Sequence, residues 1–320
     1  MMEVIKRMKK IAIPVILITL LMLSAFFSVS FAKPANTTYG TYNGMDYTQT
    51  TGELGGGDYV IYMPESWNGR FVIGCTGYNF FQDPHPEFLF NPHAKWLVSQ
   101  GYAFAASNYI GGDREYAVKE GIIRTHQLTQ YVVDKYDVTD KIFLFGISLG
   151  GQIALNLAHK YPDLYSGVLD VCGVKDAYGH IAYVQLWTTN SVAELRVIFG
   201  FPDYVPDETI AGLKLFFATV LADVIEEYGG TIEEKPQKYE RYDPVYHADL
   251  EVPIISLVGG MDLIVPLPCH YSYQTAVTAC GYSDLYRLYI VATGGHADEP
   301  VQTEILVKLL ELFTWSDILD

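Results

Sequence analysis

The pentapeptide Gly-Ile-Ser-Leu-Gly at residues 146–150 constrains the fold of this chain more than any other segment. A short apolar run precedes it at residues 141–145, and a helical pattern begins at Leu149. A serine with glycine two residues before and two residues after it is typical of a sharp turn from a strand into a helix. Glycine at those positions lets the neighbouring backbone pass close by. Ser148 is therefore the first candidate for a nucleophile.

Strand and helix patterns alternate along most of the chain. Strand patterns cover residues 59–63, 71–73, 102–106, 141–145, 166–171, 254–258 and 285–291, and helical patterns cover residues 92–100, 114–136, 149–161 and 301–312. Asn68 and Gly69 predict a hairpin turn between the first two of these strands. Regular alternation of this kind is typical of a mostly parallel sheet with helices on both faces. We therefore predict an α/β fold with such a central sheet.

One long stretch interrupts this alternation. Between Gly173 and His247 the sequence shows helical patterns only, at residues 177–187, 191–199 and 208–228. A helical block inserted after a strand can cover a site at the edge of a sheet. We therefore expect residues 58–173 and 247–320 to form the α/β core, residues 174–246 to form a helical lid, and residues 33–57 to form an exposed lead-in.

The N-terminal segment predicts export. Four basic residues, Lys6, Arg7, Lys9 and Lys10, precede an uncharged apolar run at residues 11–27, and small residues end the segment at Ala32. This order is typical of a secretory signal, so we expect residues 1–32 to be a signal peptide. The alternative is an uncleaved anchor, because the run is almost long enough to cross a bilayer. We expect a secreted or extracellular protein that contacts a membrane only through an uncleaved segment.

Charge and cysteine content restrict the possible partners and cofactors. A formal net charge of −16 argues against nucleic acid and anionic membrane surfaces as partners. Four cysteines are too few for a disulfide framework. Cys269 and Cys280 bracket a helical pattern about 16 Å long, which exceeds disulfide reach, so we predict buried free thiols. The histidines and cysteines lack the spacing of metal ligands, and we predict neither a metal nor a cofactor.

A serine nucleophile needs a base and an acid that orients the base. In an open α/β sheet these groups come from loops at the carboxyl ends of strands. Of the eight histidines, only His296 follows a predicted strand in a glycine-rich loop near the end of the chain. Asp262 follows the strand predicted at residues 254–258, and Asp170, within the strand at residues 166–171, is the main alternative. We predict a triad of Ser148, His296 and Asp262.

Two backbone N–H groups are needed to stabilise the oxyanion that forms when serine attacks a carbonyl. Leu149 directly follows the serine and is expected to supply one of them. Tyr78 is expected to supply the other, because it follows the strand at residues 71–75 and Gly77 beside it allows close approach.

The order Ser148, Asp262, His296, the glycine-flanked turn and the inserted helices together resemble the α/β-hydrolase fold superfamily. The resemblance covers about residues 59–312. Smaller pieces, at residues 67–69, 101–103 and 171–174, are similar to secreted serine hydrolases of bacteria and archaea. The chain departs from lipases and esterases of the histidine–glycine type, because Thr76 stands where those enzymes carry histidine.

The resemblance implies an exported serine hydrolase. We expect a carboxylesterase that cleaves a hydrophobic ester through an acyl-enzyme on Ser148. A serine peptidase of the prolyl oligopeptidase or aminopeptidase kind is the first alternative, because the same triad cleaves amides. An acyltransferase is another, and a surface binding module without catalysis is a fourth hypothesis from a different class. The expected partner is a small-molecule ester or a short peptide, and no oligomeric state is predicted.

Overall fold

The computed structural model describes residues 35–78, 91–109, 116–138 and 142–319. The predicted signal peptide or anchor at residues 1–32 lies outside these residues. Within the described part of the chain, no helix is both long enough and apolar enough to cross a bilayer.

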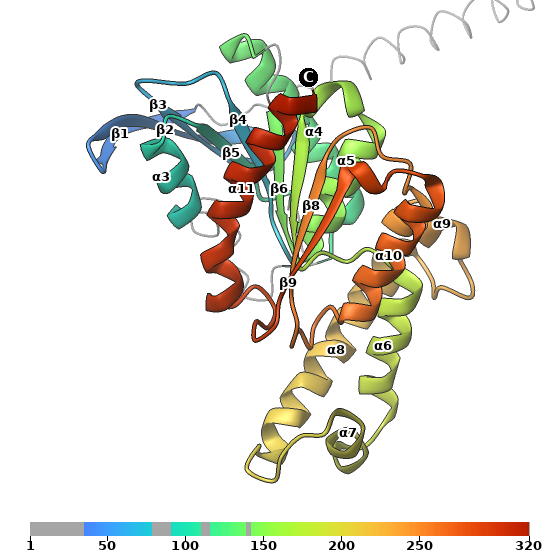
Figure 1. The fold of residues 1–320 in the computed structure, drawn as a ribbon. Coiled ribbons are helices and arrows are strands. Elements are labelled where there is room, and N and C mark those ends of the chain that lie inside the picture. The colour runs from blue at the N-terminus through green and yellow to red at the C-terminus, as the bar shows by residue number, and fades with distance from the viewer. Residues whose placement is uncertain (1–34, 79–90, 110–115, 139–141, 320) are drawn as a thin grey trace, which may run out of the picture. The chain divides into compact units, whose positions relative to one another are not determined.

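Nine strands in the described residues form one sheet, in the order β1-β2-β3-β5-β4-β6-β7-β8-β9 (Figure 1). Strands β5, β4, β6, β7, β8 and β9 pair in parallel with their neighbours in this order. The pairs β1–β2, β2–β3 and β3–β5 are antiparallel. Strand β5 therefore joins the antiparallel part of the sheet to the parallel part. The strands are β1 (Asn36–Tyr42), β2 (Met45–Leu54), β3 (Gly57–Pro64), β4 (Phe71–Cys75), β5 (Ala103–Ser107), β6 (Ile142–Ile147), β7 (Gly167–Val171), β8 (Ile254–Gly259) and β9 (Tyr286–Val291). The predicted mostly parallel sheet is confirmed.

The N-terminal part of the sheet differs from the prediction in two ways. The predicted hairpin around Asn68 and Gly69 is wrong, because β5 lies between β3 and β4 and pairs with both. Gly69 does turn the chain, with φ at 89°, but a turn residue fixes only the local reversal and not which strands pair. The expected lead-in contains β1 and β2, whose polar and half-exposed residues carry no clear strand alternation.

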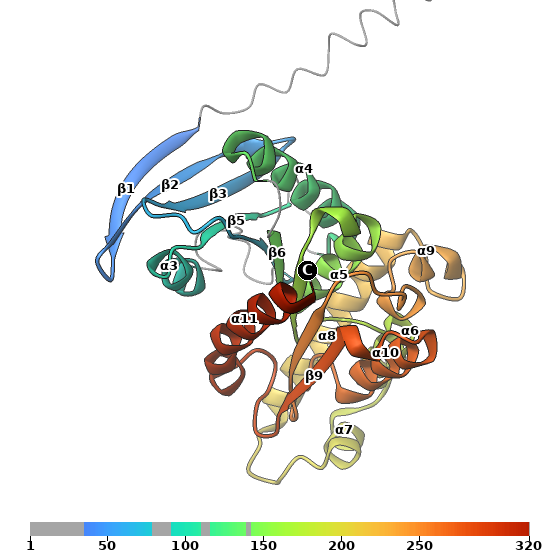
Figure 2. The same cartoon turned by 45° about the horizontal axis from the view of Figure 1, so that its top comes forward.

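Helices cover both faces of the sheet (Figure 2). The helices α3 (Asn91–Ser99) and α11 (Glu299–Leu319) share an apolar cluster with one face, and α4 (Val118–Tyr136), α5 (Leu149–Lys160) and α10 (Leu267–Cys280) share a cluster with the other. Alternate strand side chains supply both clusters: Tyr62 belongs to the first and Ile61 to the second. Burial on both faces explains why the central strands are continuous apolar runs.

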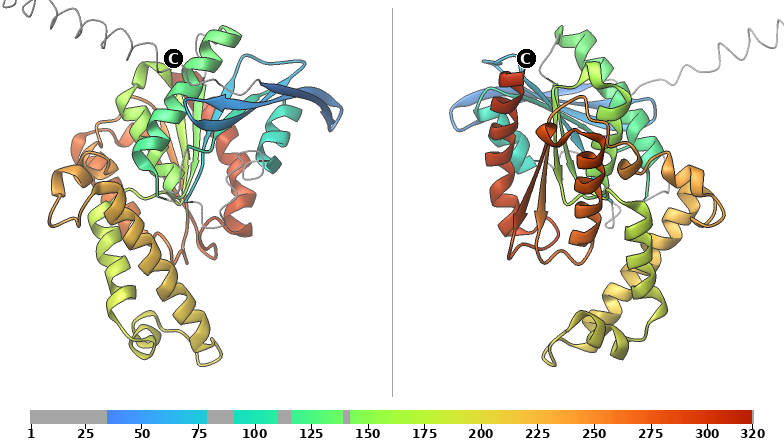
Figure 3. Two further views of the ribbon diagram at one scale, coloured as in Figure 1. Left: turned by 180° about the vertical axis from the view of Figure 1, so that it is seen from behind. Right: turned by 45° about the vertical axis from the view of Figure 1, so that its right-hand side comes forward.

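The predicted block of inserted helices lies between β7 and β8 and extends away from the sheet (Figure 3). It contains α6 (Ala177–Thr189), α7 (Val192–Phe199), α8 (Asp207–Tyr228) and α9 (Pro236–Glu240). Three short 3₁₀ helices, η1 (Pro162–Leu164), η2 (Pro244–Tyr246) and η3 (Ser283–Leu285), complete the helical elements of the described residues. Trp187 stacks on Phe199 and Phe217, with ring centroids 4.5 Å and 4.9 Å away. The insertion therefore has an aromatic core of its own.

The four cysteines are free thiols. Cys75, Cys172 and Cys269 are buried, as predicted, whereas Cys280 is exposed. Cys269 and Cys280 lie on the same helix, α10, which keeps them apart as expected. The prediction of burial is wrong for Cys280, because it is the last residue of that helix and lies beyond the face that packs on the sheet.

The carboxylate of Asp243 lies where the two ends of the insertion meet. The residue is fully buried. Its Oδ2 atom accepts a hydrogen bond from Ala177 N (2.9 Å), at the start of α6, and Oδ1 accepts one from Val245 N (3.4 Å), in η2. Burial raises the pKa of Asp243 to about 7, although the backbone donors oppose the shift.

We expect Asp243→Asn to change the pH dependence of stability. Because the pKa in the folded state lies above the ordinary value of 3.8, the folded state binds the proton more tightly than the unfolded state. The contribution of Asp243 to the free energy of unfolding is therefore largest below about pH 4 and is lost as the pH rises to about 7. Asparagine does not titrate, so the variant does not lose stability in this way. Between about pH 4 and pH 7, the free energy of unfolding of the variant relative to wild type should therefore rise by on the order of 4 kcal/mol.

Urea unfolding at several pH values measures this difference. Asp163→Asn, which changes an exposed aspartate in η1, is the matched control and should leave the pH dependence as it is in wild type. A stability difference between Asp243→Asn and wild type that stays constant with pH would contradict the raised pKa.

Candidate active site

Ser148 lies at the turn between β6 and α5. Its backbone angles are φ 57° and ψ −124°, a region that residues other than glycine rarely adopt and that is costly to maintain. Two backbone bonds hold the residue: Ser148 N donates to Val171 O (2.8 Å), and Gly151 N donates to Ser148 O (2.9 Å). The serine is thus held in a strained turn at the carboxyl edge of the sheet, where it lines a cavity.

Close backbone packing explains the two glycines of the motif. A Cβ atom on Gly146 would lie 2.2 Å from Gly150 O, and a Cβ atom on Gly150 would lie 2.0 Å from Cys75 O. Both distances are far below ordinary van der Waals contact, which begins near 3.5 Å between heavy atoms. The first turn of α5 therefore packs directly against β6 and the end of β4, and only glycine fits at either position.

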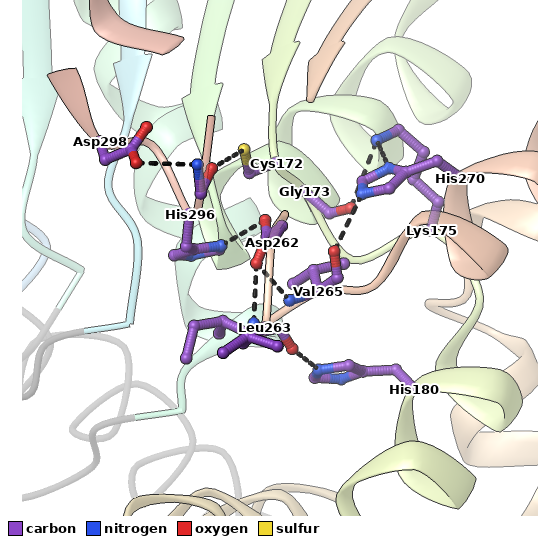
Figure 4. A network of polar contacts seen from close by, with 12 residues as sticks. Cys172, Gly173, Lys175, His180, Asp262, Leu263, Val265, His270, His296 and Asp298 are labelled. Carbon is purple, nitrogen blue, oxygen red and sulfur yellow. Dashed lines mark hydrogen bonds and ion pairs between the residues drawn. The ribbon is translucent and has the colours of Figure 1, made fainter. Parts of the chain in front are cut away.

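Asp262 and His296 form a hydrogen-bonded pair at the same edge of the sheet (Figure 4). His296 Nδ1 lies 2.8 Å from Asp262 Oδ2. The Asp262 side chain is fully buried, whereas 21% of the His296 side chain is exposed. Asp262 Oδ1 accepts bonds from Ile264 N (2.7 Å) and Val265 N (2.9 Å). Because a carboxylate accepts, His296 Nδ1 is the donor in this bond, and the neutral imidazole then has its lone pair on Nε2, as a base requires.

Backbone contacts hold the loops of this pair together. The register aligns Gly259 of β8 with Val291 of β9, so both loops leave the sheet at the same level. Gly260 N donates to Val291 O (2.8 Å), and Met261 N donates to Gly294 O (2.8 Å). The meeting of two residues that are 34 positions apart thus follows from parallel pairing of the last two strands.

The two predicted backbone donors lie beside Ser148. Leu149 and Tyr78 both line the cavity that Ser148 lines. Leu149 begins α5, and the N–H groups of a first helical turn have no partner within the helix. A Cβ atom on Gly77 would lie 3.4 Å from Ser148 Cβ, so the loop before Tyr78 runs directly past the serine. These positions suit donors for an oxyanion.

The side chain of Tyr78 joins this loop to the insertion. Its hydroxyl donates to Asp223 Oδ2 (2.6 Å), and its ring contacts Phe216 in an edge-on arrangement with centroids 6.3 Å apart. Both partners belong to α8. The loop after β4 and the longest helix of the insertion therefore meet over the cavity.

The cavity has a volume of about 510 Å³. Apolar and aromatic side chains form most of its wall, and α8 contributes Phe216, Phe217 and Val220. Its polar groups include Ser148, His180 and His296. No Asp, Glu, Lys or Arg is among the described residues that line it. A cavity of this size and composition suits an uncharged, largely apolar group.

Comparison with known proteins identifies this architecture. Residues 98–253 match the family model described as "Putative esterase". The fold is similar to that of puromycin hydrolase, with a TM-score of 0.58 and 17% identity over 89% of this chain and 39% of that chain. It is also similar to the acylaminoacyl peptidase of Pyrococcus horikoshii, with a TM-score of 0.54 and 13% identity over 92% and 43% of the two chains. The chain therefore shares the α/β-hydrolase fold of these structures.

A third similar structure is the esterase of Pyrococcus furiosus, with a TM-score of 0.53 and 13% identity over 88% of this chain and 91% of that chain. By contrast, the chain spans only 36–41% of the length of the first peptidase and puromycin hydrolase structures. No curated protein is similar enough to match it. At 13–17% identity, these structures show a shared fold.

Asp170, the alternative acid, has polar partners of its own in the core. It is fully buried in β7. One oxygen accepts a hydrogen bond from Ser256 Oγ (2.8 Å) and forms an ion pair with Lys175. Its partners therefore differ from those of Asp262, which is bonded to His296.

Cys172 is a neutral neighbour of the acid–base pair. Among the described residues, Cys172, Asp262 and His296 bring potential metal ligands within 4.8 Å of one another. These donors fit a metal poorly, because His296 Nδ1 is already bonded to Asp262 and burial raises the pKa of the Cys172 thiol to about 12. We interpret the cluster as the hydrogen-bonded pair with a thiol packed beside it.

Sequence reasoning missed several residues around Asp262. His180 and Tyr183 of α6, Lys175 before α6, and His270 of α10 all lie within the polar network of this loop. The partners are 80 or more residues apart in three of these four contacts. No local sequence pattern predicts such contacts, because they form only when the insertion packs against α10.

Proposed function

We propose that the protein is a carboxylesterase that cleaves hydrophobic esters through an acyl-enzyme on Ser148. The single observation that carries the proposal is the pairing of Asp262 with His296 at the edge of a cavity that the strained Ser148 also lines. The uncharged, aromatic wall of that cavity supports a hydrophobic acyl or alcohol group. The match to an esterase model supports the ester as the bond cleaved.

In the proposed reaction, Ser148 Oγ attacks the ester carbonyl carbon while His296 Nε2 accepts the hydroxyl proton. The resulting oxyanion is stabilised by the N–H groups of Leu149 and Tyr78. His296 then protonates the leaving alcohol, and the C–O bond of the ester breaks. A water molecule, activated by the same nitrogen, releases the acid and regenerates Ser148. Asp262 keeps His296 in the tautomer that both steps require.

The insertion is proposed to act as a lid, and its role is separable from the chemistry. Phe216, Phe217 and Val220 of α8 line the cavity, and Tyr78 bonds to Asp223 on the same helix. These contacts support a covering that excludes water and selects apolar groups. Replacing Phe217 by alanine should shift the preferred acyl chain to a longer one; an unchanged preference would count against this role.

We expect esters to be turned over faster than peptides. The test compares p-nitrophenyl esters of increasing acyl length with proline-containing and free-amine peptide anilides, using kcat/KM for each. Medium-length apolar acyl groups should give the highest values, because they fill the cavity without placing a charge in it. Higher values for the peptides would favour the peptidase alternative. The chain shares its fold with puromycin hydrolase and acylaminoacyl peptidase.

An acceptor alcohol added to the same assay separates hydrolysis from acyl transfer. Formation of the new ester in preference to free acid would favour an acyltransferase. If wild type turns over no substrate and reacts with no fluorophosphonate, the non-catalytic alternative gains support.

We also propose that the enzyme is exported. The basic residues and the apolar run within residues 1–32 support this location. Mass spectrometry of the protein recovered outside the producing cell tests it. A mass that lacks about the first 32 residues is expected for a cleaved signal, whereas protein retained in the cytoplasm would contradict export.

A further inference from the structure

Three consecutive carbonyl groups of the loop that carries Asp262 accept hydrogen bonds from side chains. We define this acid loop as residues 262–265. Tyr183 Oη donates to the carbonyl of residue 263 (2.8 Å), and His180 Nε2 donates to that of residue 264 (2.9 Å). His270 Nε2 reaches the carbonyl of residue 265 (3.3 Å). The first two side chains come from α6 and the third from α10, so the acid loop is held from the insertion and from the core. Figure 4 shows His180 and His270 on either side of this loop.

The ring of His270 is fixed in one tautomer. Because a carbonyl oxygen only accepts, His270 Nε2 carries the hydrogen in its bond to Val265. Its Nδ1 atom therefore has the lone pair, and it accepts from Lys175 Nζ at 2.7 Å. Burial, followed by the charge of Lys175, lowers the pKa of His270 well below its ordinary value. The ring is neutral and has a defined direction: it accepts from lysine and donates to the acid loop.

Lys175, which donates to His270, also makes contacts with several other groups. Lys175 and Asp170 are both fully buried and form an ion pair. Lys175 Nζ also donates to Gly173 O (3.3 Å), and its backbone carbonyl accepts from Val245 N (2.9 Å), at the far end of the insertion. A buried ion pair is weak evidence for stability, because desolvation offsets the attraction of the charges. Through His270, however, this ion pair is connected to the acid loop, which points to a role in positioning that loop.

We propose that Lys175 and His270 are positioning residues that hold the acid loop, and hence Asp262, in register with His296. Neither touches the reacting atoms; Lys175 orients His270, and His270 fixes Val265 O. Tyr183 adds a second anchor from α6. The proposal rests on the function proposed above, because it assigns Asp262 the role of the orienting acid. Small displacements of such a group are costly, since a shift of about 1 Å can lower a rate by about 10²-fold.

Two substitutions of His270 separate its two hydrogen bonds. In His270→Gln the amide nitrogen can replace Nε2 as the donor to Val265 O, whereas in His270→Asn the shorter side chain reaches only toward Lys175. We expect His270→Asn to lower kcat by about 10²-fold and His270→Gln by no more than about fivefold. KM should change little in either variant. Rates are divided by the concentration of sites that a fluorophosphonate titrates, so unfolded protein does not count.

A structural role alone would predict another result. Both variants would then lose stability, but kcat per titrated site and the pH dependence of kcat would remain as in wild type. The NMR resonance of the proton shared by His296 Nδ1 and Asp262, expected far downfield, would also remain unchanged. That result would overturn the proposal. The positioning role predicts that His270→Asn weakens or loses this resonance and shifts the midpoint of the pH–rate profile, and that His270→Gln retains both.

Tyr183→Phe keeps the test decisive if His270→Asn does not fold. The change removes only one hydroxyl from a half-buried ring on α6, and we expect about a fivefold loss of kcat. Tyr178→Phe is the matched control, because Tyr178 lies on the same helix and its hydroxyl bonds to Glu240 (3.3 Å) instead of the acid loop. Equal activity of the two variants would overturn the proposal.

The proton resonance also separates failure of this inference from failure of the proposed function. If wild type proves inactive on every ester, the function is wrong, yet the resonance still reports whether His270 holds Asp262 against His296. If wild type is active and the resonance persists in His270→Asn, the function stands and the positioning role is wrong.

Discussion

Replacing Ser148 by alanine should lower kcat for the preferred ester by on the order of 10⁵-fold. The change removes the oxygen that attacks the carbonyl, while the cavity, His296 and the backbone donors remain. Substrate should still bind, so KM should change far less than kcat. Labelling by a fluorophosphonate should disappear, because the reagent reacts with an activated serine hydroxyl.

Two controls make this result specific. Ser283→Ala changes an exposed serine in η3 and should leave both turnover and labelling as they are in wild type. Urea unfolding of Ser148→Ala should show no loss of stability large enough to explain the rate. If Ser148→Ala is labelled as strongly as wild type, Ser148 is not the nucleophile.

Replacing Asp262 by asparagine should lower kcat by on the order of 10⁴-fold. Asparagine can still accept the bonds from Ile264 N and Val265 N through one oxygen, so the loop should keep its shape. Its amide nitrogen, however, would face His296 Nδ1 as a donor. The imidazole would then place its hydrogen on Nε2, where it can no longer accept the proton of Ser148.

Asp298→Asn is the matched control for this change. Asp298 Oδ2 accepts a bond from Gly295 N (2.8 Å) in the loop of His296, and asparagine retains that acceptor while the charge is lost. We expect kcat to stay within about threefold of wild type. Comparable losses in Asp262→Asn and Asp298→Asn would show that charge near the loop matters, and not the identity of the orienting acid.

Much of the fold is predictable because its elements carry local patterns. Central strands buried on both faces are continuous apolar runs, such as Ile142–Ile147. Helices end at residues whose backbone preferences suit the last turn. Gly229, for example, ends α8 in the left-handed conformation that glycine tolerates. The N-terminal strands β1 and β2 escaped prediction because they are half exposed and polar. The pairing of β5 with β3 and β4 escaped it because a turn signal does not choose strand neighbours.

The candidate site divides in the same way. Ser148, Asp262 and His296 each follow a predicted strand, and the parallel register brings strand ends to one edge, so sequence order was enough to nominate them. Position favoured Asp262 over Asp170, because Asp170 falls inside an apolar strand pattern and Asp262 falls on a loop. The structure separates them, because Asp170 is buried against Lys175 whereas Asp262 faces His296.

By itself, the sequence determined the class of sheet and the strained turn at Ser148, since each depends on residues close together along the chain. It also placed the three predicted triad residues, each directly after a predicted strand. Only the tertiary structure decided which acid faces His296, which residues of the insertion line the cavity, and how Lys175, His270 and Tyr183 hold the acid loop. Those contacts join segments far apart in sequence. They form only when the packing of the insertion and α10 against the sheet brings polar groups within hydrogen-bond distance, and no local pattern encodes that distance.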